Sequence, residues 1–299
     1  MSVRTADYSA TRRFSIGRFL SSSVVYLLLG GGAFLVSVPF YWLIRTSLMA
    51  EGDHSVWPPI FWPNPVVWQT YVEIFQQKSI PMTQFLLNST ILVVLATTGE
   101  LISTSLAAFA FGRLRWRGRN LMFALLVATM FLPAQVTIIP LFLLFRNLGW
   151  LNSLWPLIVP SWLGHALYIF LVRQFIYTIP TELDDAARID GCGTFRIYWN
   201  IIVPLSAPAL ATIAIFSFQS KWNQFFEPLI YINKVDTLPI AVGVRMFQSS
   251  IASGGGATGM ISWSHLLAAT VVMVLPIVVV FFVAQRAFIQ GSVVSGVKG

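Results

Sequence analysis

The sequence predicts an all-α membrane protein with six transmembrane helices. Its 299 residues are 56% hydrophobic and only 10% charged, whereas soluble domains carry about 25% charged residues. Six apolar runs follow one another, and a helix needs about 20 such residues to cross the hydrocarbon of a bilayer. Backbone polar groups in lipid must be bonded internally, so we expect these runs to be helices that bend at proline and glycine.

We expect a basic amino-terminal segment (1–23), a six-span domain (24–285) and a short tail (286–299). The expected spans cover residues 24–44, 85–112, 121–145, 155–176, 206–231 and 265–284. The first run is long for a signal peptide and lacks a clear cleavage site, so we expect a span that is retained. Pro133 and Pro140 are expected to kink the third span.

Positive charges favour one side of the membrane. If the amino terminus is inside, thirteen of the nineteen lysines and arginines fall on the inner side. These are Arg4, Arg12, Arg13, Arg18, Arg113, Arg115, Arg117, Arg119, Arg173, Arg188, Arg196, Arg286 and Lys298. Cytoplasmic loops carry such an excess, so the sequence predicts that both termini are cytoplasmic.

A polar stretch at 180–205, between the fourth and fifth spans, predicts two short helices joined by a turn. Thr181 is placed to cap the first helix, with Asp184 three residues later as in a capping box. Gly191 ends that helix, because glycine takes the left-handed conformation that a helix stop needs. The second helix is amphipathic, since four apolar residues share one face. They are Phe195, Tyr198, Trp199 and Ile202.

This stretch resembles the coupling signature of ABC importer permeases, which reads Glu-Ala-Ala, then Gly, then Ile-x-Leu-Pro. The matching residues are Asp185, Ala186, Ala187, Gly191, Ile201, Val203 and Pro204. It is closest to the longer form of the carbohydrate-uptake branch, of the type of the second permease subunit of the maltose transporter. This chain departs from the family's signature at three positions: it has Asp185 in place of Glu, Cys192 in place of Ala and Val203 in place of Leu.

Other parts of the chain extend the resemblance. Residues 107–114 are similar to the exit of the family's second span, and the Trp222-Asn223 pair resembles its fifth-span pattern. The likeness covers most of residues 24–299. It implies the type I ABC importer permease fold and a cytoplasmic coupling segment that meets an ATPase. The implied coupling residues are Glu182, Asp185, Ala186, Ala187, Asp190 and Gly191.

The resemblance also implies the partners of the chain. These are a second homologous permease subunit, an ABC ATPase dimer, an extracytoplasmic solute-binding protein and the lipid bilayer. ATP and Mg²⁺ are expected on the ATPase, because no phosphate-binding loop occurs here and Gly254-Gly-Gly256 lacks the following lysine. We therefore expect no cofactor on this chain, no catalytic residue and a bacterial or archaeal cytoplasmic membrane location.

Composition argues against other ligands. The single cysteine permits neither an internal disulfide nor a thiolate metal cluster. The three histidines, His54, His165 and His265, are far apart in sequence and do not form a metal motif. The net charge of +8 follows the sidedness of the membrane, so no nucleic-acid partner is expected.

Polar residues inside the spans are the candidate solute pathway. Glu100 lies near the middle of the second span, where a carboxylate must face protein or water rather than lipid. In the fifth span Gln219, Asn223 and Glu227 recur every four residues, with Gln224 beside them. Amides both donate to and accept from sugar hydroxyls. The candidates are Glu100, Gln219, Asn223 and Gln224, and a packing or gating role remains the alternative.

The sequence thus predicts a permease subunit of an ATP-driven importer for a sugar or oligosaccharide. The alternative within the class is another polyol-like solute, such as glycerol phosphate. An ion-driven secondary transporter with Glu100 as the coupling acid is a further alternative, and uptake that survives ATP depletion would favour it. A membrane-embedded enzyme is opposed by the lack of a nucleophile–base or metal-ligand cluster in the sequence.

Overall fold

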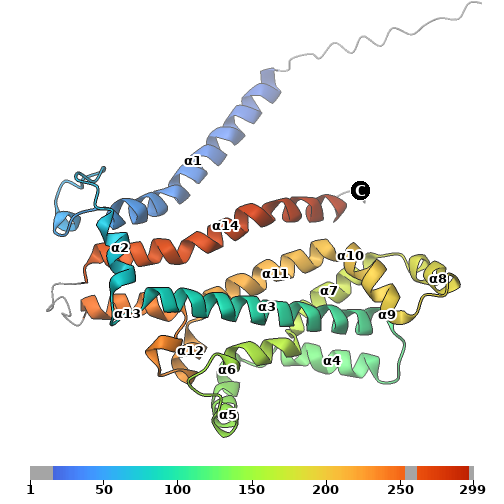
Figure 1. The fold of residues 1–299 in the computed structure, drawn as a ribbon. Coiled ribbons are helices and arrows are strands. Elements are labelled where there is room, and N and C mark those ends of the chain that lie inside the picture. The colour runs from blue at the N-terminus through green and yellow to red at the C-terminus, as the bar shows by residue number, and fades with distance from the viewer. Residues whose placement is uncertain (1–15, 253–260, 296–299) are drawn as a thin grey trace, which may run out of the picture.

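The computed structural model describes residues 16–252 and 261–295, which form helices and turns without a strand (Figure 1). Most of the basic amino-terminal segment, the end of the tail and the glycine-rich part of the last loop lie outside these residues. The helices of eight or more residues are α1 (Ile16–Ser47), α2 (Gln69–Gln76), α3 (Met82–Arg113), α4 (Arg119–Thr129), α5 (Ala134–Asn147), α7 (Ala166–Thr178), α8 (Glu182–Ile189), α11 (Ala207–Trp222), α13 (Ile240–Ala252) and α14 (Trp263–Ser295). The shorter ones are η1 (Asp53–Ser55), α6 (Trp155–Ile158), η2 (Val159–Leu163), α9 (Thr194–Ile197), η3 (Tyr198–Ile202), α10 (Val203–Leu205), α12 (Phe226–Tyr231) and η4 (Val235–Thr237).

Four helical segments in the described part of the chain are long and apolar enough to cross a membrane. They are Ser23–Ser47, Met82–Arg113, Trp155–Thr178 and Trp263–Ala284. A fifth crossing results if Thr194–Leu205 and Ala207–Trp222, which meet at 74°, count as one broken span. The first, second, fourth and sixth expected spans thus coincide with these four segments, and the count of six stays a prediction.

The third expected span differs from the sequence expectation of one kinked helix. It consists of two shorter apolar helices, α4 and α5, which run in different directions (Figure 1). Pro133 has extended backbone angles (φ −61°, ψ 133°) and precedes α5. Proline has no N–H to donate and disfavours helix at the residue before it, so the chain breaks here. Pro140 stays inside α5.

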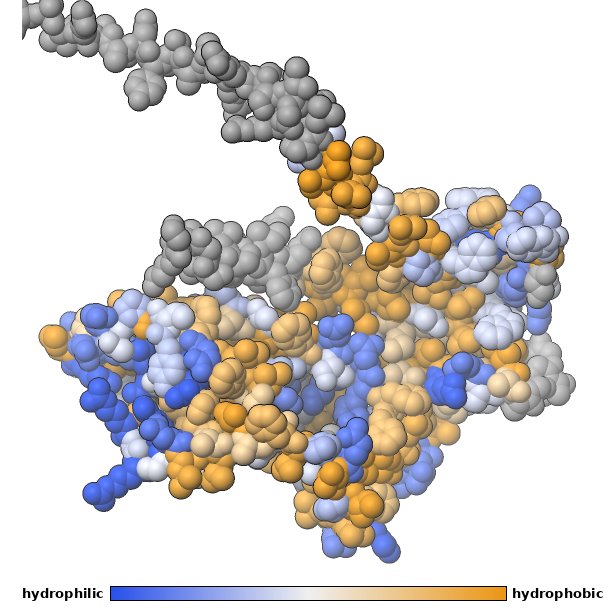
Figure 2. Space-filling model, turned by 180° about the vertical axis from the view of Figure 1, so that it is seen from behind, coloured by the Kyte–Doolittle hydropathy of each residue, from blue (hydrophilic) through white to orange (hydrophobic). Residues whose placement is uncertain are grey.

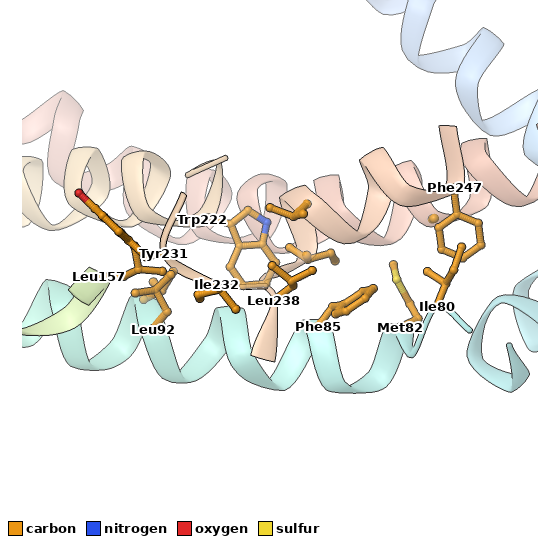
Figure 3. Close-up of a cluster of buried hydrophobic side chains, with 14 of the residues drawn as sticks. Ile80, Met82, Phe85, Leu92, Leu157, Trp222, Tyr231, Ile232, Leu238 and Phe247 are labelled. Atoms are coloured by element: carbon orange, nitrogen blue, oxygen red, sulfur yellow. The ribbon is translucent and has the colours of Figure 1, made fainter. Parts of the chain in front are cut away.

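Helix α3 is the centre of the fold, because α7, α11 and α13 all pack against it. Its first half carries a cluster of buried apolar side chains that includes Phe85 and Leu92 (Figure 3). Trp222, at the end of α11, joins this cluster and donates its indole N–H to the Met273 carbonyl of α14 at 2.9 Å. One apolar cluster therefore holds α3, α11 and α14 together.

Polar side chains of α3 fix the segment before α13. The Asn88 amide donates to the carbonyls of Asp236 and Leu238 at 2.8 and 3.0 Å. The Ser89 hydroxyl accepts from the Ile240 N–H at 2.8 Å. The described part of the segment between the fifth and sixth expected spans contains α13, which packs on α3 and α14.

The segment between α1 and α3 is attached to the start of α14. Ser264 donates to the Met49 carbonyl at 2.9 Å, so the His54 Nε2, also 2.9 Å from this hydroxyl, must donate to it. Burial lowers the pKa of His54, and its buried Nδ1 has no partner among the described residues. These contacts fit a neutral imidazole. The residue after Ser264 is His265, whose Nε2 lies 3.0 Å from the Glu73 carboxylate of α2.

The surface has the pattern of a membrane protein. Seen from behind, apolar residues cover the middle of the body, and hydrophilic residues gather at the end that carries α8 (Figure 2). A smaller hydrophilic patch lies among the apolar residues near the centre (Figure 2). Every residue of helix α1 from Val24 to Val36 is exposed, and the helix leans away from the body (Figure 1). Exposed apolar helices of this length need lipid or another membrane chain around them.

Candidate functional site: the α8 segment and a membrane-level cavity

Helix α8 begins without the side-chain cap that the sequence suggested. Thr181 itself has helical angles, and its hydroxyl makes no capping bond. Its carbonyl instead accepts from the N–H groups of Asp184 and Asp185 at 3.0 and 3.2 Å. Asp184 is unavailable for a capping box because its carboxylate points to another helix. The acids of the first turn still oppose the positive end of the helix dipole.

The end of α8 matches the expectation for Gly191, whose φ is +79°. The Gly191 N–H donates to the Arg188 carbonyl at 3.0 Å, and the Cys192 N–H donates to the Ala187 carbonyl at 2.9 Å. This pair of bonds is the Schellman motif. Any side chain at Gly191 would strain the stop, even though open space surrounds it.

A buried ion pair holds α8 to the end of α3. Arg113 Nε lies 3.3 Å from Asp184 Oδ2, and the two side chains are only 4% and 5% exposed. The contact is an ion pair without hydrogen-bond geometry, and Asp184 Oδ1 is left without a partner among the described residues. Arg113 also donates from Nη2 to the Ile179 carbonyl at 2.7 Å. One guanidinium thus connects α3, the end of α7 and α8.

The ion pair determines which face of α8 is free. Ala187 is only 7% exposed and packs in a buried cluster with Ile197, Tyr198 and Ile202. Its small size therefore permits close packing inside this chain. The opposite face is exposed and both acidic and apolar. It carries Glu182, Leu183, Asp185, Ala186, Ile189 and Asp190, and Ile189 is 87% exposed.

The second helix of the segment divides its aromatic residues between two environments. Residues 198–202 form a π-helical turn, which rotates the side chains that follow it. Tyr198 is buried and its hydroxyl lies 2.7 Å from that of Ser105 in α3. Phe195 and Trp199, predicted on the same face, are 70% and 60% exposed. They extend the exposed apolar surface beside α8.

A recess of about 570 Å³ lies between the end of α3 and α8. Its walls carry four arginines, Arg113, Arg115, Arg119 and Arg188, together with Asp184 and Asp185. Outside the buried pair, Arg188 donates to Asp185 at 2.9 Å, and both side chains are more than half exposed. Such an exposed pair contributes little to stability.

A second cavity, of about 340 Å³, lies at the middle of α3. Glu100, Lys221, Gln224 and Glu227 line it with His165 and Ser161, and Phe145 and Tyr231 contribute aromatic walls. Glu100 is 3% exposed, and its Oε2 accepts from the Ser217 hydroxyl of α11. Charged groups at membrane depth are costly unless they face protein or water, and this cavity provides such a setting.

Interruptions of two helical segments form the walls of this cavity. Helix α11 ends at Trp222 and α12 starts at Phe226, so the helix of the fifth expected span is interrupted. Between η2 and α7 the chain turns at Gly164, where φ is +79° and an added Cβ would meet Ile169 and the Ser103 hydroxyl. Irregular backbone at membrane depth occurs where it is buried in protein or lines a cavity.

The cavity gathers two of the four candidate pathway residues. Glu100 and Gln224 line it, whereas Gln219 and Asn223 are exposed outside it. The Asn223 amide donates back to the Gln219 carbonyl at 2.9 Å and closes the last turn of α11. The sequence predicted Gln219, Asn223 and Glu227 on one continuous helix. Because α11 ends at Trp222, Glu227 lies on a different helix, α12. Lys221, which was not among the candidates, also lines the cavity.

The chain is similar to membrane components of solute importers. A family model described as "Binding-protein-dependent transport system inner membrane component" matches residues 101–292. The sn-glycerol-3-phosphate transport system permease protein of Yersinia pestis is 33% identical over 266 residues, which are 88% of this chain and 92% of that protein. The sulfoquinovosyl glycerol transport system permease protein of Agrobacterium fabrum is 30% identical, with 94% and 93% covered.

Solved structures agree on the fold. A chain from a bacterial ABC transporter involved in the import of the acidic polysaccharide alginate has a TM-score of 0.77 and 25% sequence identity. The match covers 91% of this chain and 98% of that one. A chain of the alginate transporter with its pentasaccharide-bound periplasmic protein has a TM-score of 0.60 at 14% identity, which bears on the fold alone. The all-α permease fold is thereby confirmed.

Proposed function

This chain belongs to the binding-protein-dependent transport system inner membrane components, and from that premise we propose that α8 is the surface through which an ATPase drives it. The chain is a permease subunit of an ABC importer. ATP and Mg²⁺ bind to the partner ATPase dimer, and ATP-driven switching of that dimer moves α8. A second homologous permease subunit and an extracytoplasmic solute-binding protein complete the transporter.

The observation that carries this proposal is the exposed face of α8. Ile189 is 87% exposed on a helix whose opposite face is fixed by the buried pair of Arg113 and Asp184. An exposed apolar side chain rimmed by carboxylates is typical of a protein interface. The rigid attachment means that a force on α8 is transmitted to α3.

The solute is a carbohydrate or another polyol-like compound. Two similar permeases are named for sn-glycerol-3-phosphate and sulfoquinovosyl glycerol, and the neighbouring transporter imports alginate. All three are compounds with several oxygen functions, and amide side chains both donate to and accept from such groups. With α8 in the cytoplasm, both termini are cytoplasmic, as the arginine distribution favours.

Reversing one charge on the exposed face should separate the ATPase from the membrane subunits. In Asp185→Lys, attraction to a basic group of the ATPase becomes repulsion, which costs several kcal/mol between like charges. We expect ATPase recovery with the purified membrane subunits to fall by at least roughly tenfold. The measurement is copurification from membranes, followed by solute-stimulated ATP hydrolysis.

Asp236→Lys is the matched control, because Asp236 is also exposed and the change in charge is the same. Asp236 lies next to Asn88 of α3. Asn88 is 25 residues before Arg113, so about 38 Å of helix separates the control position from the attachment of α8. The control should retain wild-type ATPase recovery. Equal recovery in the two variants would remove α8 from the interface.

A further inference from the structure

We propose that the 340 Å³ cavity beside Glu100 is a solute subsite within this chain that accepts neutral polyhydroxy compounds and disfavours anions. The inference rests on the proposed transport function and specifies the charge class of the solute. The volume lies at the lower end of the roughly 300–1,000 Å³ typical of small-molecule sites.

The position of the cavity suits a transport site. Glu100 follows Met82 by 18 residues and precedes Arg113 by 13, so it lies near the middle of α3. Transporter sites lie near the bilayer midplane, where discontinuous helices meet. Here the break after Trp222 and the turn at Gly164 both reach the cavity.

The charges of the lining argue against an anionic solute. The lining contains two acidic side chains, Glu100 and Glu227, and one basic side chain, Lys221, so its formal charge, counted with histidine neutral, is minus one. Like charges brought together in a protein cavity repel one another. A phosphate or carboxylate in this cavity would meet two carboxylates and one ammonium.

The hydrogen-bonding groups instead suit hydroxyls. Ser217 donates to Oε2 of Glu100, while Oε1 makes no hydrogen bond within the described part of the chain. Gln224 Oε1 is buried and also unpartnered there. Carboxylate and amide oxygens accept from hydroxyl groups, and Lys221 donates to hydroxyl oxygens.

Two aromatic rings form part of the cavity wall. Phe145 and Tyr231 line the same cavity and meet edge to face, with ring centroids 5.1 Å apart. Aromatic walls beside a few directed polar groups are the usual composition of small-molecule sites. The combination favours a sugar-like solute with apolar C–H faces and several hydroxyls.

A neutral solute would set this chain apart from transporters of acidic solutes. Similar proteins are named for a phosphate ester and for import of an acidic polysaccharide. A pathway for such anions is expected to present a net positive lining. We therefore expect the solute of this chain to differ in charge from theirs.

The test uses the complete transporter in detergent, without its solute-binding protein, and equilibrium binding of radiolabelled probes. Glucose and glucuronate form a matched pair that differs by one carboxylate, and maltose and glycerol 3-phosphate form a second pair. We expect the neutral member of at least one pair to bind at least roughly tenfold more tightly than its anionic partner. Stronger binding of the anions, or no binding of any probe, would overturn the inference.

Two variants test whether the preference for neutral over anionic probes comes from this cavity. Glu100→Gln keeps the size of the side chain, and Glu227→Gln changes a less buried position in case the first variant folds poorly. Each should reduce the neutral-to-anion ratio by several-fold, whereas Glu73→Gln, the same change outside the cavity, should leave the ratio unchanged. An unchanged ratio in both cavity variants contradicts the inference. If ATPase copurification is normal in that case, the proposed function still stands.

Discussion

Arg113→Ala should uncouple the transporter and destabilise this chain. The substitution leaves the carboxylate of Asp184 buried without a counter-ion and the Ile179 carbonyl without its donor. Removing one partner of a buried pair costs about 3–5 kcal/mol, because the remaining charge is uncompensated. We expect a lower unfolding midpoint in detergent and loss of ATP-driven uptake in proteoliposomes.

The surface pair on the same helix is the control for Arg113. Arg188 and Asp185 are 2.9 Å apart but 55% and 67% exposed, and such pairs contribute about 0–1 kcal/mol. Arg188→Ala should therefore keep the wild-type unfolding midpoint. The double variant Arg113→Ala/Asp184→Ala should recover part of the lost stability, since no orphan charge remains. A wild-type midpoint and normal uptake in Arg113→Ala would refute the role of the pair.

Gly243→Ala should loosen α13 from α3. A Cβ at Gly243 would overlap the ring of Phe85, which is fully buried and cannot move aside. Overpacking of a core costs about 1–3 kcal/mol, which exceeds the gain of up to about 1 kcal/mol in helix propensity. The unfolding midpoint of the purified subunit measures the difference.

Two other helical glycines are the controls for Gly243. At Gly99 the added methyl group would meet the ring of Trp162, which is 47% exposed and has room to turn, so the loss should be smaller. At Gly30 nothing lies within 4 Å, so alanine should be neutral or stabilising. Equal midpoints for all three variants would contradict the packing of Phe85 against α13.

The sequence predicts what depends on local chemistry. Long apolar runs predict α1, α3 and α14, and the motif around Asp185 predicts a short helix that ends at Gly191 with positive φ. These features follow from hydropathy and from glycine's freedom at one position, and the structure confirms them.

Features that depend on distant partners were beyond the sequence. The pairing of Arg113 with Asp184 joins residues 71 positions apart in the chain, and it turns Ala187 inward and Ile189 outward. The polar spacing in the fifth span predicted one helical stripe, but Pro228 has no N–H to donate to the Gln224 carbonyl, and the helix is broken after Trp222. Pro133 does mark the break between α4 and α5, although the sequence alone does not distinguish a break from a kink.

Photo-crosslinking from Ile189 in the assembled transporter shows whether α8 meets an ATPase. We expect a covalent adduct between this position and the ATPase subunit, and none from a probe at the exposed Lys234 near the other end of α3. Adducts from position 189 with lipid or with another membrane chain, and none with the ATPase, would contradict it.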